Sequence, residues 1–230
     1  FPSQRERARV REKTILSTKK LTSSQKKMFQ NLNIPVIDYD AIEINYIDFD
    51  SPKQVSCGIF TSQNAVLSLL QNPNWETLKS KPVFCVGLKT QELLTSKGFN
   101  VIAFTGYAAD LAEIISLIYS KETYTFFNGN LRRDVLPNTL QENEITFNEI
   151  EVYETNLTSK KITTKIDGIL FFSPSAVESY LKLNAIKDQM CFCIGESTSE
   201  ALENRNIQNI IIAEKPSVEN VINDILEHYQ

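Results

Sequence analysis

Phe60-Thr61-Ser62-Gln63-Asn64-Ala65-Val66 reappears at an offset of 111 residues as Phe171-Phe172-Ser173-Pro174-Ser175-Ala176-Val177. A second segment, residues 84–94 (FCVGLKTQELL), reappears at an offset of 108 as residues 192–202 (FCIGESTSEAL). Each segment has the pattern of an apolar strand, a polar turn with Ser or Thr, and then a helix. Two copies of this pattern predict two similar α/β domains, whose strand ends we expect to face each other across a cleft.

The composition is that of an ordinary globular protein with 230 residues, of which 42% are hydrophobic and 23% charged. The longest apolar runs, residues 169–172 and 210–213, are far too short to cross a bilayer. No charged and then apolar leader opens the sequence. We therefore expect a cytoplasmic monomer without a membrane partner.

The four cysteines lack the spacing of a metal site. Cys191 and Cys193 are two residues apart in an apolar strand, so their side chains point the same way. Further Cys or His ligands would be needed for zinc, and the chain has one histidine, His228. We expect buried, inert thiols and no metal.

The net charge of −4 gives no reason to expect nucleic-acid binding. Residues 1–12 are the exception, since Arg5, Arg7, Arg9 and Arg11 follow one another closely there. We predict that this basic tail is disordered and leave it out of the functional interpretation.

Short strands alternate along the chain with helices of about ten residues, which is typical of parallel βαβ units. The series restarts after Tyr153 with one strand fewer, and the apolar run at 13–18 supplies that strand. We predict a discontinuous domain of residues 13–37 plus 155–230, with residues 38–154 inserted as a second domain. Residues 36–44 and 145–153 alternate apolar and polar side chains, and we interpret them as paired connectors that form a hinge. The expected fold class is two similar, flavodoxin-like parallel sheets with helices on both faces, joined by a two-stranded linker.

Ligands of open α/β sheets bind outside the carboxyl ends of the strands, where helix N-termini favour anions. Hydroxyl side chains follow the predicted strands at this edge in both copies. They are Thr61, Ser62, Thr90, Thr105, Ser173, Ser175, Ser197 and Thr198. Helix capping alone explains any one of them, whereas their repetition in both copies favours a binding role.

Two further features lie outside the repeat. Asn128 and Gly129 predict a tight turn, after which Arg132 and Arg133 fall near a helix start, where the helix dipole disfavours cations. Either an anionic partner binds there or the pair is an ordinary solvated one. Tyr153 ends the second connector, where its ring can pack between domains or its phenol can donate a proton.

Most familiar enzyme classes are excluded by what the sequence lacks. It has no Walker-type loop, no GxGxxG, no nucleophile elbow and no histidine placed for Cys–His chemistry. Catalysis by this chain would have to depend on positioning and proton delivery.

Six segments in order resemble the uroporphyrinogen-III synthase family. They are FTSQNAV (60–66), FCVGLKTQELL (84–94), NGNLRRDVLPNTL (128–140), VYET (152–155), ILFFSPSAVESYL (169–181) and FCIGESTSEAL (192–202). The resemblance extends from about residue 14 to residue 226. It implies that the chain removes the hydroxyl group of hydroxymethylbilane as water and cyclises it with inversion of ring D. The product is uroporphyrinogen III, and the family uses no cofactor or metal.

The resemblance also assigns roles to residues. Tyr153 matches the family's tyrosine and is the candidate for assisting loss of the hydroxyl group. Residues matching the substrate-binding segments are Ser62, Thr90, Ser173, Thr198, Arg132 and Arg133. The chain departs from the family at Asn64, where relatives often carry Arg.

One other function is compatible with these patterns, and a further one fits them poorly. A non-enzymatic, hinged two-domain protein could bind or sense an anionic small ligand, since doubled domains and twin linkers suit both roles. A receiver-like signalling domain would need an acidic cluster at the strand ends, where this chain has Ser and Thr. Conversion of hydroxymethylbilane separates the enzyme from the binding protein.

Overall fold

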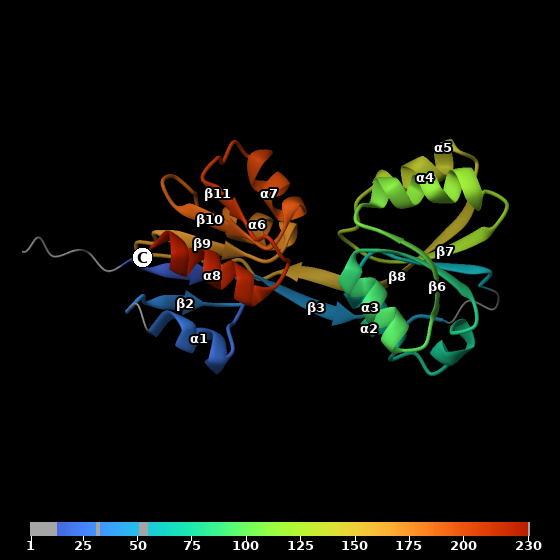
Figure 1. The fold of residues 1–230 in the computed structure, drawn as a ribbon, viewed down its shortest axis with the longest axis horizontal. Helices are drawn as coiled ribbons and strands as arrows, with labels where there is room; N and C mark the ends of the chain where they lie inside the picture. The colour runs from blue at the N-terminus through green and yellow to red at the C-terminus, as the bar shows by residue number, and fades with distance from the viewer. Residues whose placement is uncertain (1–12, 31–32, 51–54, 230) are drawn as a thin grey trace, which may run out of the picture. The chain divides into compact units, whose positions relative to one another are not determined.

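The computed structural model describes residues 13–30, 33–50 and 55–229, so the predicted basic tail lies outside the described residues. The chain divides into two compact units (Figure 1). The terminal unit comprises Phe1–Glu43 and Leu157–Gln230, and the central unit comprises Ile44–Asn156. The chain therefore passes from one unit to the other after residue 43 and after residue 156, against expected boundaries after 37 and 154.

The terminal unit contains a five-stranded sheet in which every pair of neighbouring strands is parallel. Its strands, in sheet order, are β11 (Ile210–Ile212), β10 (Met190–Cys193), β9 (Gly168–Phe171), β1 (Ile15–Ser17) and β2 (Val36–Asp38). Numbered along this unit, the order is 2-1-3-4-5, which is the flavodoxin-like arrangement. The sequence predicted four of these strands, and the fifth, β2, comes from the segment that we interpreted as a connector.

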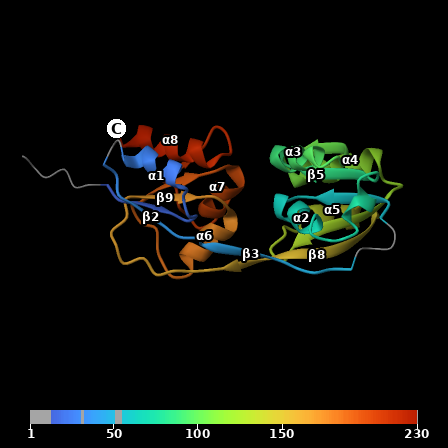
Figure 2. The same ribbon diagram turned by 90° about the horizontal axis from the view of Figure 1, so that it is seen from below.

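Helices cover both faces of the terminal sheet, because its strands are apolar on both sides. On β9, the side chain of Leu170 lies in the core on one face of the sheet, and those of Ile169 and Phe171 lie in the core on the other face. Figure 2 shows α1 and α8 on one side of the sheet and α6 on the other. The helices are α1 (Ser23–Gln30) and α8 (Val218–His228) on the first face, and α6 (Pro174–Leu181) and α7 (Glu196–Glu203) on the second.

The central unit contains a six-stranded sheet. Its strands, in sheet order, are β3 (Ile42–Tyr46), β8 (Thr146–Leu157), β7 (Thr123–Gly129), β4 (Cys57–Phe60), β5 (Pro82–Val86) and β6 (Asn100–Thr105). The five strands from β8 to β6 are parallel. β3 runs antiparallel to β8, since Ile47 N–H donates to the Val152 carbonyl and Thr158 N–H donates to the Ala41 carbonyl. The two predicted connector segments thus pair through β3 and β8.

Two pairs of helices cover the central sheet, α2 and α3 on one face and α4 and α5 on the other (Figure 1). They are α2 (Gln63–Leu69), α3 (Leu88–Ser96), α4 (Ala108–Ile118) and α5 (Val135–Glu142). A 3₁₀ helix at Trp75–Leu78, which the sequence did not predict, follows α2. The predicted fold class, two α/β units with largely parallel sheets, is confirmed. In the part of the chain that the structure describes, none of the helices has the length and apolar character of a membrane span.

The duplication extends to strand register and to helix ends. Phe60 pairs with Cys85 across β4 and β5, and their counterparts Phe171 and Cys193 pair across β9 and β10. After α1 and α5, Asn33 and Glu144 adopt φ values of 50° and 56°, and these residues are 111 positions apart. The copies therefore cover β1 to β6 and β7 to β11.

The strands of the two copies are exchanged between the sheets. β1 and β2 of the first copy join β9, β10 and β11, whereas β7 and β8 of the second copy join β4, β5 and β6. Counted from β7, the parallel part of the central sheet has the same 2-1-3-4-5 order as the terminal sheet. Each unit thus presents an equivalent carboxyl edge, built from both copies of the sequence.

Candidate functional site

The two repeated serines occupy equivalent positions in their units. Ser62 is the N-cap of α2, and its Oγ accepts the Asn64 N–H at 3.1 Å. Ser173 is the N-cap of α6, and its Oγ accepts the Ala176 N–H at 3.1 Å. Both serines lie half-buried at the carboxyl end of a strand, so each cap satisfies one orphan helix donor at the predicted edge.

The two repeated threonines lie one strand further along each sheet. Thr90 N–H donates to the Gly87 carbonyl at 3.1 Å, and Thr198 N–H donates to the Gly195 carbonyl at 3.0 Å. Their exposed fractions are 4% and 1%. The structure thus places these threonines in the first turns of α3 and α7, which follow β5 and β10, with little side-chain surface open to solvent.

Tyr153 and Ser62 come together in the central unit. Tyr153 lies on β8, and its phenol shares a hydrogen bond with the Ser62 side chain. The Tyr153 ring lies directly over Gly129, at the carboxyl end of β7. A Cβ atom on residue 129 would come within 2.6 Å of Cε2 and 2.8 Å of Cε1 of that ring. Only glycine leaves room for the ring, so three elements, β8, β7 and the start of α2, hold this phenol.

The environment of Tyr153 keeps its phenol protonated. Burial raises the pKa of Tyr153 above its ordinary value of 10.0, and the hydrogen bond from Ser62 offsets part of this rise. Ser62 Oγ accepts the Asn64 N–H, and its hydroxyl hydrogen can stabilise a negative charge on the Tyr153 oxygen, which is why the Ser62 contact lowers the pKa.

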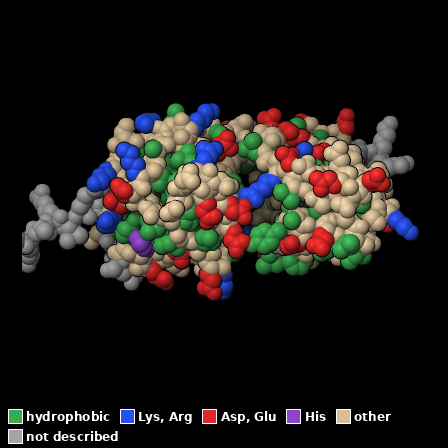
Figure 3. Space-filling model, turned by 90° about the horizontal axis from the view of Figure 1, so that it is seen from above, with side chains coloured by type: hydrophobic (Ala, Val, Ile, Leu, Met, Phe, Trp, Pro, Cys, Tyr) green, Lys and Arg blue, Asp and Glu red, His purple; other side chains and the backbone are tan. Residues whose placement is uncertain are grey.

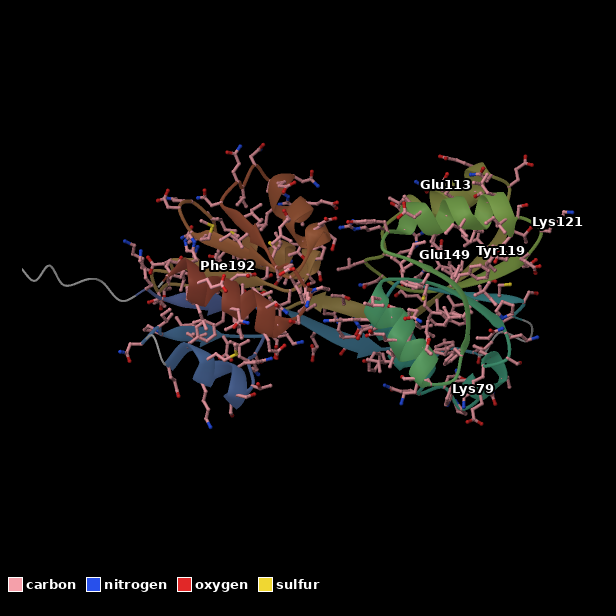
Figure 4. All side chains as sticks on the ribbon, in the orientation of Figure 1. Lys79, Glu113, Tyr119, Lys121, Glu149 and Phe192 are labelled. Atoms are coloured by element: carbon pink, nitrogen blue, oxygen red, sulfur yellow. The ribbon has the colours of Figure 1, made fainter. Side chains whose placement is uncertain are left out.

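Arg132 precedes α5, as predicted, but two carboxylates of the chain bind its guanidinium. Its Nη2 donates to Glu149 Oε1 at 3.0 Å, and its Nε also donates to Glu149. Nη1 pairs with Asp134, the N-cap residue of α5. Glu149, labelled in Figure 4, lies on β8. Arg133 follows as an exposed residue. Two cations near a helix N-terminus are unfavourable because the helix dipole is positive there, and Glu149 and Asp134 offset this effect with their negative charge.

The contacts of three polar residues around Tyr153 were not predicted from the sequence. Asn128, which we expected in a tight turn, belongs instead to β7, and its amide donates to Glu149. Asn130 accepts the Thr155 N–H at 2.8 Å through Oδ1. Ser68 of α2 donates to the Val152 carbonyl. The Asn-Gly-Asn sequence indicated a polar site at this strand end. It could not identify the partners on β8, because these lie more than 20 residues away along the chain.

Among the residues that the structure describes, His, Cys, Asp and Glu side chains form no cluster of three or more that is suited to a metal. All four cysteines are free and buried. Burial raises the pKa of Cys57 and Cys85 to about 11 and that of Cys191 and Cys193 to about 12. Such thiols stay protonated near neutral pH and are poor nucleophiles.

The only histidine packs against aromatic rings of the terminal unit. The His228 ring lies 5.6 Å from that of Phe192 and 4.7 Å from that of Tyr229. Phe192 is labelled in Figure 4. A cavity of about 380 Å³ beside His228 is lined by Asp167 and Met190, which lie at the amino ends of β9 and β10. His228 is therefore at the sheet edge opposite the serine and threonine turns. Figure 3 shows both acidic and basic side chains on the visible face of each unit, with the acidic ones more numerous on the unit at the right.

Comparisons with known proteins point to one family. The sequence model of the family described as uroporphyrinogen-III synthase HemD matches residues 24–223. The chain is 23% identical over 276 residues to uroporphyrinogen-III synthase of Saccharomyces cerevisiae, covering 99% of this chain and 98% of that protein. It is 24% identical over 251 residues to porphyrin biosynthesis protein HemD of Ruminiclostridium josui, covering 94% of this chain and 49% of that relative.

Solved structures share the fold. The structure of uroporphyrinogen-III synthetase from Helicobacter pylori matches with a TM-score of 0.69 and 23% identity, over 94% of this chain and 99% of that chain. A mutant uroporphyrinogen III synthase from Thermus thermophilus matches with a TM-score of 0.71 and 11% identity, over 94% and 98%. At such low identity the structural likeness shows the common architecture alone.

Proposed function

The chain belongs to the uroporphyrinogen-III synthase family, and from this membership we propose that it converts hydroxymethylbilane into uroporphyrinogen III. The reaction removes the substrate's hydroxyl group as water and closes the linear tetrapyrrole with inversion of ring D. The observation that supports this function best is the Tyr153 phenol, which Ser62 and Gly129 hold at the carboxyl edge of the central sheet.

Tyr153 has the right protonation state to assist loss of the hydroxyl group. The raised pKa keeps its phenol neutral at pH 7, so it has a proton to donate. As the carbon–oxygen bond breaks, its electron pair leaves with the oxygen, which takes the proton and departs as water. Water has a pKa of about 15.7, far above that of a phenol, so this proton transfer is favourable. A hydrogen bond from Ser62 stabilises the phenolate that forms.

The steps that follow need geometry more than functional groups. Loss of water leaves a reactive azafulvene, and attack on it through the substituted carbon of ring D gives the spiro intermediate of the inverted isomer. The protein must favour that carbon over its unsubstituted neighbour, and orientation of bound groups can contribute several orders of magnitude to such a choice. We propose that this orientation is the main catalytic contribution of the protein.

The carboxylates of the substrate need partners, and we propose the repeated hydroxyl turns for this role. The residues are Ser62 and Thr90 in the central unit, Ser173 and Thr198 in the terminal unit, and Arg132 and Arg133 before α5. Helix N-termini and Ser or Thr hydroxyls suit carboxylates without a dense cluster of cations. The near-complete burial of Thr90 and Thr198 indicates that their turns contribute more through backbone N–H groups than through the hydroxyls.

Arg132 has donors to offer a substrate carboxylate. A guanidinium carries five N–H donors, and Glu149 accepts two of them and the exposed Asp134 one. A substrate carboxylate could use the other N–H groups of Nη1 and Nη2 and leave the pair with Glu149 intact. We propose Arg132 as a binding residue whose charge Glu149 keeps oriented.

We further propose that the protein acts as a cytoplasmic monomer. Light scattering at micromolar concentration should give the mass of one chain, 26.2 kDa. A mass of two chains would contradict it.

The rate at which hydroxymethylbilane disappears tests the proposed function. The substrate closes spontaneously, so the measurement compares its loss with and without protein at equal pH. We expect strong acceleration that is proportional to protein concentration. Tight binding with an unchanged or slower rate of closure would instead favour a binding protein or sensor for an anionic ligand.

A further inference from the structure

The strand that carries Tyr153 contains a β-bulge immediately before this residue. Along β7 and β8, Asn128 pairs with Glu151, but the next residue, Gly129, pairs with Tyr153. Val152 is therefore an extra residue in β8. Bulges are rare between parallel strands and are enriched next to active sites, where they redirect a side chain.

The bulge changes the face of the sheet to which Tyr153 points. Before it, the side chains of β8 alternate: Phe147 packs on the face of α4 and α5, and Ile150 on the face of α2 and α3. Strict alternation would place Val152 beside Ile150 and Tyr153 on the opposite face. Instead, Val152 and Tyr153 both pack against the core on the α2 and α3 face. The extra residue thus brings the phenol to Ser62, the N-cap of α2.

Hydrogen bonds on both sides fix the backbone at the bulge. Ser68, with an exposed fraction of 2%, donates from α2 to the carbonyl of Val152, which also accepts the Ile47 N–H at 3.0 Å. Beyond the bulge, the Asn130 amide accepts the Thr155 N–H at 2.8 Å and donates to the Thr155 carbonyl at 3.4 Å. Asn130 N–H also donates to the Tyr153 carbonyl at 3.3 Å.

We propose that Ser68 and Asn130 are positioning residues that hold the Val152 bulge and thereby aim the Tyr153 phenol. Neither side chain has to touch the substrate. The role of the phenol in turnover rests on the proposed function, whereas the direction of the phenol follows from the backbone that these residues fix.

Two alanine variants test the proposal by kinetics. In Ser68→Ala and Asn130→Ala we expect kcat to fall by about 10-fold to 100-fold with little change in KM, since a displacement of about 1 Å can cost 100-fold in rate. Ser116→Ala and Asn184→Ala are the controls. Ser116, like Ser68, is a helix serine that donates to a backbone carbonyl, in its case that of Ala112. Asn184 bridges the Ile162 N–H and the Lys160 carbonyl as Asn130 bridges Thr155. The controls should keep kcat within about twofold, because neither bonds to the backbone around the Val152 bulge.

The effect must also depend on Tyr153. In a Tyr153→Phe background, Ser68→Ala and Asn130→Ala should lower kcat no further, because the group that they aim is gone. An equal fold-loss in both backgrounds would overturn the proposal. Circular dichroism and thermal melts verify that the variants are folded, and Ser68→Ala leaves the Val152 carbonyl its bond from Ile47.

A spectroscopic measurement does not require activity. The protein is labelled with 3-fluorotyrosine, and the ¹⁹F resonance that disappears in Tyr153→Phe is assigned to Tyr153. In Ser68→Ala and Asn130→Ala this resonance should shift, and the pKa of the labelled phenol should fall relative to the parent, since burial is what raises it. An unmoved resonance would contradict the positioning role. A moved resonance with full turnover in Tyr153→Phe would instead reject the proposed chemistry and leave the positioning intact.

Discussion

The terminal and central units are built from the same elements, yet they differ at the position that we propose for proton donation. In both, parallel strands have the order 2-1-3-4-5, a serine caps the first helix of the repeat, and a buried threonine lies in the first turn of the next helix. Tyr153 has no such counterpart, since the residue 111 positions earlier is Ile42. Duplication supplies two similar edges suited to anions, and β8 alone adds the tyrosine that we propose as the acid.

Replacing Tyr153 should have the largest effect. Tyr153→Phe keeps the ring over Gly129 and removes the proton, so we expect kcat to fall by about 100-fold or more. Ile42→Val, at the corresponding position of the other copy, should change kcat by less than about twofold. Steady-state kinetics with hydroxymethylbilane measure both. Similar losses in the two variants would mean that the difference between the copies is not catalytic.

The two serine caps separate stability from catalysis. Ser62→Ala and Ser173→Ala should each lower the free energy of unfolding by about 1 kcal/mol, because each loses a cap bond to a helix N–H. Only Ser62→Ala also loses the bond to Tyr153, so its kcat should fall by roughly fivefold to tenfold. The pKa of Tyr153 should rise further, since Ser62 lowers it. A kcat of Ser62→Ala equal to that of the parent protein would contradict a role of Ser62 in the mechanism.

Gly87 and Gly195, the N-cap residues of α3 and α7, differ in backbone conformation. Gly87 has a φ of 89°, whereas Gly195 has a φ of 176°, which any residue adopts. Gly87→Ala should therefore lower the free energy of unfolding by about 1–2 kcal/mol, and Gly195→Ala by less than about 0.5 kcal/mol. Urea denaturation measures both values. A larger loss in Gly195→Ala would show that the φ difference between the turns has no energetic consequence.

The smallest expected difference concerns the thiols of the two units. A thiol with a raised folded pKa stabilises the protein at pH values below its unfolded pKa, and this contribution is lost as the pH rises through the folded pKa. Stability should therefore decline from about pH 9 toward pH 12. Cys57 and Cys85, with pKa values of about 11, should begin to react with a thiol reagent at lower pH than Cys191 and Cys193, at about 12. Peptide mapping after alkylation checks the order, and the reverse order would contradict it.

Local sequence patterns predicted most elements well because each has a local cause. The helix expected at residues 63–70 is found at Gln63–Leu69, since Ser62 marks its start. The strand expected at 190–194 is found at Met190–Cys193, because a strand buried on both faces is continuously apolar.

Features that depend on pairing between distant segments could not be predicted from the sequence. Alternation over residues 36–44 indicated an extended chain, but not that it divides into β2 in one sheet and β3 in the other. The bulge at Val152 exists only as a mismatch of register between β7 and β8. The pairing of Arg132 with Glu149 likewise requires that parallel contact. The candidate residues were thus found from type and position, whereas the contacts that orient them came from the structure.

The isomer that the purified protein forms from hydroxymethylbilane tests the central claim most directly. Spontaneous closure gives the type I ring, so the product itself reports whether the protein directs attack to the substituted carbon of ring D. We predict uroporphyrinogen III as the main product, separated from the type I isomer by chromatography. Formation of the type I isomer alone would contradict the account.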